Sequence, residues 1–174
     1  MARPGPTGTG GAKPGAAAGG LMCPSASASA QDAVVIGIAA ADADAPPRIA
    51  YLDAPLPVTP DILAATAPAA PNRVLRTAAA CAEGACGHYD GHACTLATRL
   101  VAALDAAVDR PPACAIRPHC RWWRQEGKAA CLRCPMVITD SDDAGEAFRA
   151  AARPPAGAAS EAASTPPAFA PPPA

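Results

Sequence analysis

The chain has 174 residues, of which 51% are hydrophobic, and its formal net charge at pH 7 is −1. Alanine supplies 49 residues, whereas Val, Ile, Leu and Phe together supply only 24. These 24 are about 14% of the chain, below the roughly 20% at which a compact core becomes doubtful, so any core must be small. This composition excludes a large multidomain enzyme, and the charge excludes a globally basic nucleic-acid-binding protein. No apolar run is long enough for a transmembrane helix.

Both ends of the chain are rich in Pro, Ala and Gly. Residues 1–30 lack the apolar segment of a secretory signal, so we expect no export. Cys23 follows a Leu-Met pair, as at a lipoprotein cleavage site, but no apolar region precedes it and we take the likeness as accidental. Because such low-complexity sequence cannot offset its ordering entropy, we expect disordered tails over 1–30 and 151–174. One cysteine-rich domain is expected over residues 31–150.

The first half of this domain contains short strand and helix patterns. Residues 34–38 (VVIGI) and 49–52 (IAYL) are β-branched, apolar runs that predict two strands. Thr59 offers an N-cap hydroxyl and is followed by Pro and Asp, which predicts a short helix through about Ala67. Residues 73–77 fit either a third strand or a helical turn.

The second half begins with a clearer helical pattern. From Thr95 onward, apolar residues recur at every fourth position, at Leu96, Leu100, Leu104 and Val108. This spacing predicts one amphipathic helix that packs on the core and ends before the next Pro-Pro pair.

The segments that follow are shorter. Residues 120–130 are expected to form a helix or turn, and residues 136–139 a strand. Asp143 with Glu146 three residues later predicts a capping box for a short helix that carries Phe148. A few short strands and helices together predict a small α+β domain.

Seven of the eight cysteines lie between residues 81 and 134, together with all three histidines. A reducing cytosol disfavours disulfides, so metal binding is the leading use. The second half of this cluster has the spacing C-x5-C-x10-C-x2-C-P, and four thiolates suit zinc or a [4Fe-4S] cluster. We therefore expect an iron–sulfur cluster or zinc to be held by Cys114, Cys120, Cys131 and Cys134.

A second group lies earlier in the chain, where glycines let the backbone bend around an ion. Its predicted metal ligands are Cys81, Cys86, His88 and Cys94. A bound metal would add its binding free energy to the folding of a domain with a small core. Two alternatives remain, namely a disulfide framework in an exported domain and cysteines that are simply small buried hydrophobes.

A basic and aromatic patch surrounds the later cysteines. Its members are Arg117, His119, Arg121, Trp122, Trp123, Arg124, Lys128 and Arg133. Such residues can bind phosphate and stack on bases, so a nucleic acid is a possible partner. We favour a different use, in which the cations offset the negative charge of the thiolates and one Trp packs over the metal site.

Three stretches carry a resemblance: PRIAYLDAPLPVTPDIL, CAEGACGHYDGHACTLATRLV and CAIRPHCRWWRQEGKAACLRCPMVIT. They resemble a group of small cysteine-rich bacterial proteins with no assigned activity. The resemblance spans residues 47–139, and its most specific part is CAIRPHCRWWRQEGKAACLRCP. It implies that this middle region is the domain, and it implies no catalytic residue.

We therefore expect a small cytoplasmic metal-binding protein, with an iron–sulfur cluster that serves electron transfer or sensing with a protein partner. A zinc-stabilised module for nucleic acid or protein is the first alternative. A cysteine-dependent enzyme is the second, in which a Cys and a His would act as nucleophile and base. We expect it less, because the CxxC sequence precedes Pro and a strand-like run rather than starting a helix. No membrane association is expected.

Overall fold

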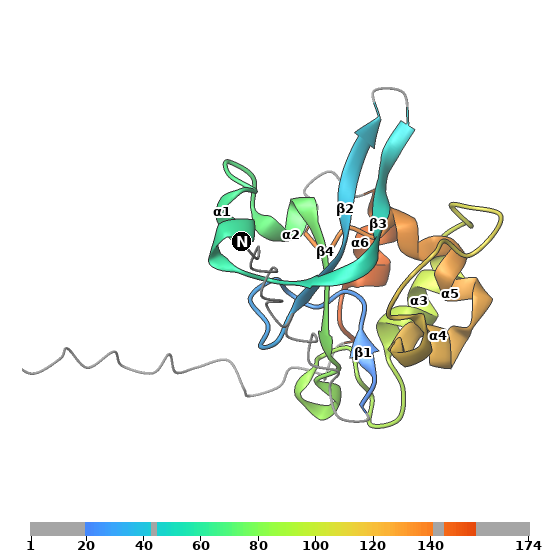
Figure 1. Cartoon of the computed structure of the whole chain (residues 1–174). Helices are drawn as coiled ribbons and strands as arrows, with labels where there is room; N and C mark the ends of the chain where they lie inside the picture. Colours follow the sequence, from blue (N-terminus) through green and yellow to red (C-terminus); the bar gives the residue numbers. More distant parts are fainter. Residues whose placement is uncertain (1–19, 43–44, 141–144, 156–174) are drawn as a thin grey trace, which may run out of the picture.

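The computed structural model describes residues 20–42, 45–140 and 145–155, and these form a mixed α+β fold (Figure 1). The predicted fold class is therefore confirmed. At the centre is a four-stranded antiparallel sheet with the strand order β1-β4-β2-β3. The strands are β1 (Met22–Cys23), β2 (Val34–Asp42), β3 (Ala45–Pro57) and β4 (Leu75–Ala80).

The two strands predicted from β-branched runs are both present and both longer than predicted, as β2 and β3. They form a long antiparallel hairpin, with a register shift between Val35 and Gly37. β4 lies between β1 and β2 and is buried along most of its length. Its alanines are small enough for neighbouring elements to approach closely, and two polar residues, Arg76 and Thr77, are 0% exposed there.

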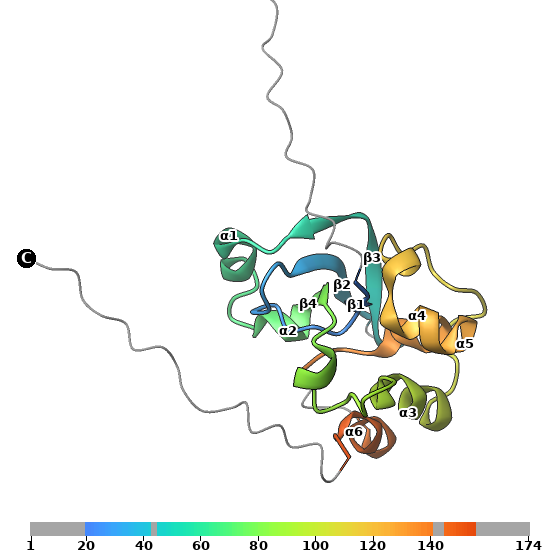
Figure 2. The same cartoon turned by 90° about the horizontal axis from the view of Figure 1, so that it is seen from below.

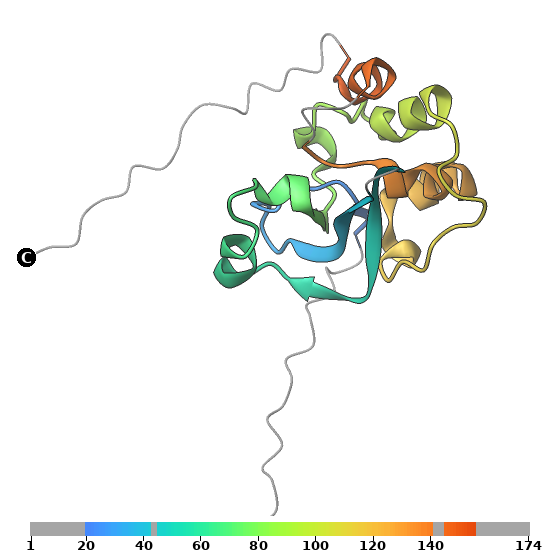
Figure 3. The ribbon, with the colours of Figure 1, turned by 90° about the horizontal axis from the view of Figure 1, so that it is seen from above.

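Two short helices precede β4 and lie on one side of the sheet (Figure 3). α1 (Pro60–Ala64) begins as predicted, since the Thr59 side chain accepts a hydrogen bond from the Ile62 N–H at 3.3 Å. α2 (Pro71–Val74) runs directly into β4. The ambiguous segment 73–77 is therefore the end of a helix followed by the start of a strand.

The remaining helices follow β4 in the chain. They are η1 (Glu83–Ala85), α3 (Thr95–Ala103), η2 (Arg117–His119), α4 (Arg121–Glu126), α5 (Lys128–Arg133), η3 (Cys134–Met136) and α6 (Glu146–Ala152), where η marks a 3-10 helix. Of these, α3, α4, α5 and α6 lie on the other side of the sheet (Figures 1 and 2). α6 packs beside α3 (Figure 2). Gly127, with φ of 58°, separates α4 from α5, and this left-handed conformation favours glycine.

Three sequence predictions need correction or fall outside the described residues. The helix predicted to reach Val108 ends at Ala103, because Leu104 is extended, although its side chain still packs against the core. The strand predicted over 136–139 is absent from the described chain: Val137 is buried, but its carbonyl accepts from Arg76 Nη1 at 2.6 Å instead of joining a ladder. Asp143, predicted to cap α6, lies outside the described residues.

The folded part also begins earlier and ends later than predicted. β1 belongs to the sheet, Pro24 and Ala28 are buried, and Thr77 Oγ1 donates to the Ala26 carbonyl at 2.6 Å. Residues 20–30 are thus structural, and the tail predicted over residues 1–30 is too long. At the other end Ala151 is buried and its carbonyl accepts from Arg99 Nε at 2.8 Å, so the fold extends past the predicted boundary at 150.

The core lies between the sheet and the helices that follow it. Its buried members are Ile36, Ala78, Cys94, Ala97, Leu100, Ile116, Cys120, Trp122, Ala130, Val137 and Ala151. Four of these are alanines and two are cysteines from the predicted metal-binding groups. The core is accordingly small, and the cysteine side chains are part of it.

Candidate metal centre

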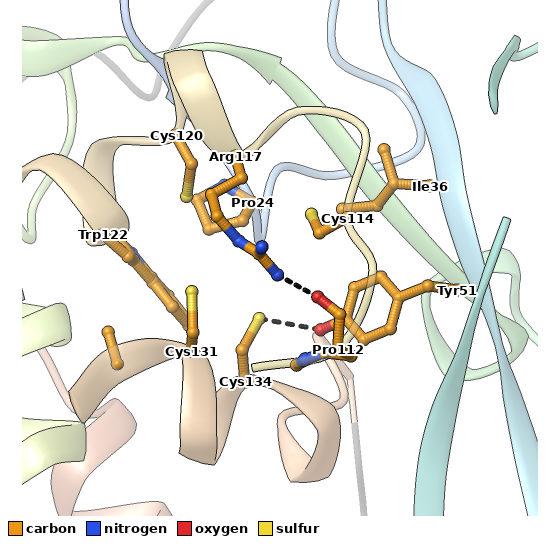
Figure 4. Close-up of a pocket in the computed structure, with 11 residues that line it drawn as sticks. Pro24, Ile36, Tyr51, Pro112, Cys114, Arg117, Cys120, Trp122, Cys131 and Cys134 are labelled. Carbon is orange, nitrogen blue, oxygen red and sulfur yellow. Dashed lines mark hydrogen bonds between the residues drawn. The ribbon is translucent and has the colours of Figure 1, made fainter. Parts of the chain in front are cut away.

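Four separate segments bring Cys114, Cys120, Cys131 and Cys134 to one pocket (Figure 4). Cys114 lies in the loop before η2, and Cys120 is the N-cap residue of α4. Cys131 lies in α5, and Cys134 begins η3. Because Gly127 lets α5 turn back on α4, the sulfur atoms of these cysteines face a shared space. The cysteines predicted to act together are therefore neighbours.

The pocket has mostly apolar walls. Besides the four cysteines it is lined by Pro24, Ile36, Tyr51, Pro112, Arg117, Trp122 and Ala130, and its empty volume, open side included, is about 370 Å³. Residues from β2, β3 and the segment after β1 thus face residues from the C-terminal helices. This low-polarity enclosure strengthens every electrostatic interaction inside it.

Burial favours the neutral thiol form of three of these cysteines by raising the pKa. It raises the pKa of Cys120 to about 12, and it also raises the pKa of Cys114 and Cys131. Cys134 adds to the rise at all three positions, because thiolates this close repel one another. Deprotonation of all four therefore needs a compensating positive charge, which a bound metal supplies.

Hydrogen-bond donors converge on Cys134. The Tyr51 hydroxyl donates to its Sγ at 3.0 Å, and Arg76 Nη2 donates to the same sulfur at 3.5 Å. Burial and the neighbouring Cys134 raise the pKa of Tyr51, so its hydroxyl stays protonated and able to donate. Sequence reasoning did not find Tyr51 or Arg76. Arg76 could have been singled out because it is the one charged residue in the apolar, alanine-rich segment LRTAAA.

Arg76 is the most buried cation of the described chain. It is 0% exposed, and no carboxylate of residues 20–42, 45–140 or 145–155 forms an ion pair with it. Its guanidinium lies 5.4 Å from the centroid of the Trp122 ring, and its Nε has no hydrogen-bond partner among the described residues. A buried cation without an anion is costly. The Sγ of Cys134, which would become anionic on deprotonation, lies 3.5 Å from Arg76 Nη2.

Arg117 lies among the four sulfur atoms (Figure 4). Its Nη2 donates to the Pro112 carbonyl, and its guanidinium lies 5.5 Å from the centroid of the Trp123 ring. Its charge favours the thiolates of Cys131 and Cys114, partly offsetting the effect of burial on their pKa.

Arg121 and Arg133 of the basic patch are engaged within the protein, whereas His119, Arg124 and Lys128 are exposed. Arg121 forms an ion pair with Glu83 and lies over the Tyr89 ring, and Arg133 donates to two backbone carbonyls. Trp122 is 2% exposed, so it cannot stack on a base. These contacts give Arg121, Arg133 and Trp122 structural roles within the protein.

The four sulfur atoms do not surround the position of a single ion. Within the described ranges, no three Cys, His, Asp or Glu side chains are arranged to hold one metal ion. A tetrahedral zinc site needs its sulfur atoms at about 2.3 Å from a common point. In a [4Fe-4S] cluster each thiolate binds a different iron, so the sulfur atoms lie farther apart. The four thiols of the described chain thus line one pocket without meeting at one point.

The earlier predicted group follows the C-terminal end of β4 and leads into α3. Cys81 follows β4, Cys86 follows η1, and Cys94 is the N-cap residue of α3. The fourth predicted ligand, His88, has another partner, since its Nδ1 lies 3.1 Å from Arg99 Nη2. Burial and the Arg99 charge lower the pKa of His88. The ring therefore links this loop to α3.

Comparison of the chain with protein-family models, curated proteins and solved structures finds no match. The resemblance to small cysteine-rich bacterial proteins therefore stays a prediction. In the described part of the chain, no helix combines the length and the apolar character needed to cross a bilayer.

Proposed function

We propose that Cys114, Cys120, Cys131 and Cys134 bind a [4Fe-4S] cluster and that the protein uses it for electron transfer or sensing with a protein partner. The observation that carries this proposal is that four thiols from separate segments line one pocket without converging on a single point. A cubane cluster accounts for both properties, because it occupies the space between thiolates that bind different irons. In the loaded protein, the cluster takes the space in which the Arg117 guanidinium lies.

The charges around the pocket support the same proposal. A thiolate-ligated cluster is anionic, and Arg76 is a buried cation with Nη2 3.5 Å from Cys134 Sγ. Hydrogen bonds to ligand sulfur atoms help to set the reduction potential of a cluster. The Tyr51 and Arg76 donors therefore support a redox role for the pocket.

Catalysis by a cysteine is less well supported. A nucleophilic cysteine needs a lowered pKa, whereas burial raises the pKa of Cys114, Cys120 and Cys131. The CxxC pair also lies at the end of α5, away from any helix start that follows a strand. All eight cysteines are free thiols. This supports a reducing compartment, for which we propose the cytoplasm.

Anaerobic purification with metal analysis tests the proposal. We expect a brown protein that absorbs near 400 nm and contains iron and acid-labile sulfide. Replacing any one of the four cysteines with Ser, for example Cys131→Ser, removes about four iron atoms per chain and destabilises the domain. Leu132→Ala, between Cys131 and Cys134, is the matched control and keeps the iron. A colourless protein that contains zinc and no iron would overturn the proposal.

A further inference from the structure

β1 brings Cys23 to the earlier group of cysteines. β1 pairs with β4 so that Cys23 lies opposite Ala79, and the ladder continues where the Cys81 N–H donates to the Leu21 carbonyl at 2.8 Å. Residues two apart on a strand share a face, and diagonal neighbours across a pair are within reach of each other. Cys23 and Cys81 are therefore placed on the same face, side by side.

Cys86 and Cys94 lie in the segment that leads from the end of β4 to α3, and each is fixed by hydrogen bonds. The Cys86 N–H donates to the Glu83 carbonyl at 2.8 Å, which closes the η1 turn that follows Cys81. Gln125 of α4 fixes Cys94 twice: the Cys94 N–H donates to Gln125 Oε1 at 2.8 Å, and Gln125 Nε2 donates to the Cys94 carbonyl at 3.0 Å.

The electrostatics of the thiols indicate that they are neighbours. Burial raises the pKa of Cys23 to about 11, and the charges of Cys81 and Cys94 add to this rise. Burial also raises the pKa of Cys94, and Cys86 adds to it. Each of the four cysteines thus interacts with at least one other.

We propose that Cys23, Cys81, Cys86 and Cys94 form a second four-thiolate site that binds an iron–sulfur cluster. The kind of metal rests on the function proposed above, whereas the site itself rests on these four residues. Cys23 replaces His88 as the fourth ligand, since the His88 ring contacts Arg99. The eight cysteines then divide into two quartets. This division is not visible when only the seven cysteines between residues 81 and 134 are counted.

The two quartets are adjacent through one layer of side chains. Met22 forms an isolated bridge with Cys120, and Pro24 lines the first pocket, so both chain neighbours of Cys23 touch the first site. Trp122 also lines that pocket, and on its other side it favours the thiolate of Cys94. Its Nε1–H makes no hydrogen bond within ordinary limits in the described chain. We therefore expect two clusters in these positions to be close enough for their unpaired electrons to interact.

Metal content distinguishes the second site from the first. Anaerobically purified protein should contain about eight iron atoms and eight sulfides per chain. Cys23→Ser and Cys131→Ser should each halve this content, and the double variant should contain almost none. His88→Ala is the matched control, because it removes the ligand that the sequence alone suggested; it should keep all of the iron.

Electron paramagnetic resonance tests the adjacency on the unaltered protein. After reduction with dithionite, which adds one electron to each cluster, the spectrum should be broadened by spin–spin interaction. Cys23→Ser should simplify it to the spectrum of one isolated cluster.

Three results would overturn the second site while leaving the first proposal in place. One is about four iron atoms per chain that Cys23→Ser leaves unchanged and Cys131→Ser removes. Another is loss of iron in His88→Ala but not in Cys23→Ser. The third is zinc in place of the second set of iron atoms. Failure of the function proposed for the first pocket looks different, because Cys131→Ser would then leave the iron content unchanged.

Discussion

At the scale of single residues, Arg76 is a fully buried cation, which costs free energy unless it is paired. It projects from a buried strand, donates to the Val137 carbonyl at 2.6 Å and reaches Cys134 Sγ. Its charge also favours the thiolate of Cys23, against the effect of burial on that pKa. One guanidinium thus interacts with a member of each quartet. A buried Arg is stable where it is paired, and anionic clusters on both sides would pair it.

The hydroxyl of Tyr51 gives a prediction about redox potential. Tyr51→Phe keeps the ring and removes the donor to Cys134 Sγ. A hydrogen bond to sulfur stabilises the more negative, reduced cluster, so its loss should lower the potential. For a bond that contributes about 1 kcal/mol, the fall is about 40 mV. A spectroscopic redox titration measures it. Only one of the two clusters should shift, and an unchanged pair of potentials would show that Tyr51 does not contact a ligand.

The buried thiol of Cys120 gives a prediction about pH in the metal-free protein. Its pKa is about 12 in the folded state, against 9.0 for an ordinary thiol. A group whose folded pKa is raised contributes stability that is present below pH 9 and is lost as the pH rises toward 12. Between pH 8 and pH 10 the unfolding free energy should fall by about 1 kcal/mol from this thiol alone.

Urea unfolding at the two pH values, with a chelator and a reductant present, measures this change. Cys120→Ala should show a smaller fall between the same two pH values, whatever its stability at pH 8. An equal fall in both proteins would mean that another group carries the pH dependence.

At the scale of elements, the two-residue strand β1 connects the sheet to α4 and to the first pocket. It supplies an edge of the sheet, contacts α4, and carries Cys23 between two residues that touch the first pocket. The segment after β1 also forms hydrogen bonds with the rest of the fold. Its Ala26 carbonyl accepts from Thr77 Oγ1, and its Ala28 N–H donates to Asn72 Oδ1 at 2.8 Å.

Truncation tests the role of β1. Removing residues 1–19, within the tail predicted from sequence, should leave the midpoint of unfolding unchanged. Removing residues 1–30 deletes β1, buried Pro24 and Ala28, and their hydrogen bonds. It should cost about 2 kcal/mol or more of unfolding free energy and half of the iron. Differential scanning calorimetry and iron analysis compare the two. Equal stability would restore the tail boundary at residue 30.

Local patterns predicted the elements that depend on neighbouring residues. The Thr59 cap, the strands of β2 and β3 and the quartet within residues 114–134 all follow from short-range sequence. The pairing of β1 with β4 could not be predicted, because a two-residue strand has no periodicity and its partner lies far along the chain. Cys23 was missed for the same reason. The run at 136–139 does not form the predicted strand, and its one buried residue, Val137, packs in the core instead of pairing in the sheet.

At the scale of the whole molecule, a nearly neutral chain concentrates its arginines around the thiols. The Arg117 guanidinium stacks on Trp123, Arg121 pairs with Glu83, and Arg76 is enclosed. These interactions occupy three arginines inside the protein and leave His119, Arg124 and Lys128 as the exposed cations of the patch.

We therefore expect weak binding of nucleic acid. Fluorescence anisotropy with labelled single-stranded RNA and DNA should give no submicromolar affinity at physiological salt. Replacing Arg117 or Arg121 should instead alter the absorbance of the clusters, whereas Lys128→Gln should not. Tight binding that falls steeply with salt, and less steeply once Arg124 and Lys128 are neutralised, would favour the nucleic-acid-binding alternative.

The two quartets enclose very different lengths of chain, and this sets the order in which the protein matures. One lies within residues 114–134, where short-range contacts form quickly. The other joins residue 23 to residues 81–94, so its thiols meet only after β1 has found β4 across the intervening hairpin. When iron is scarce, the later-synthesised quartet should fill first.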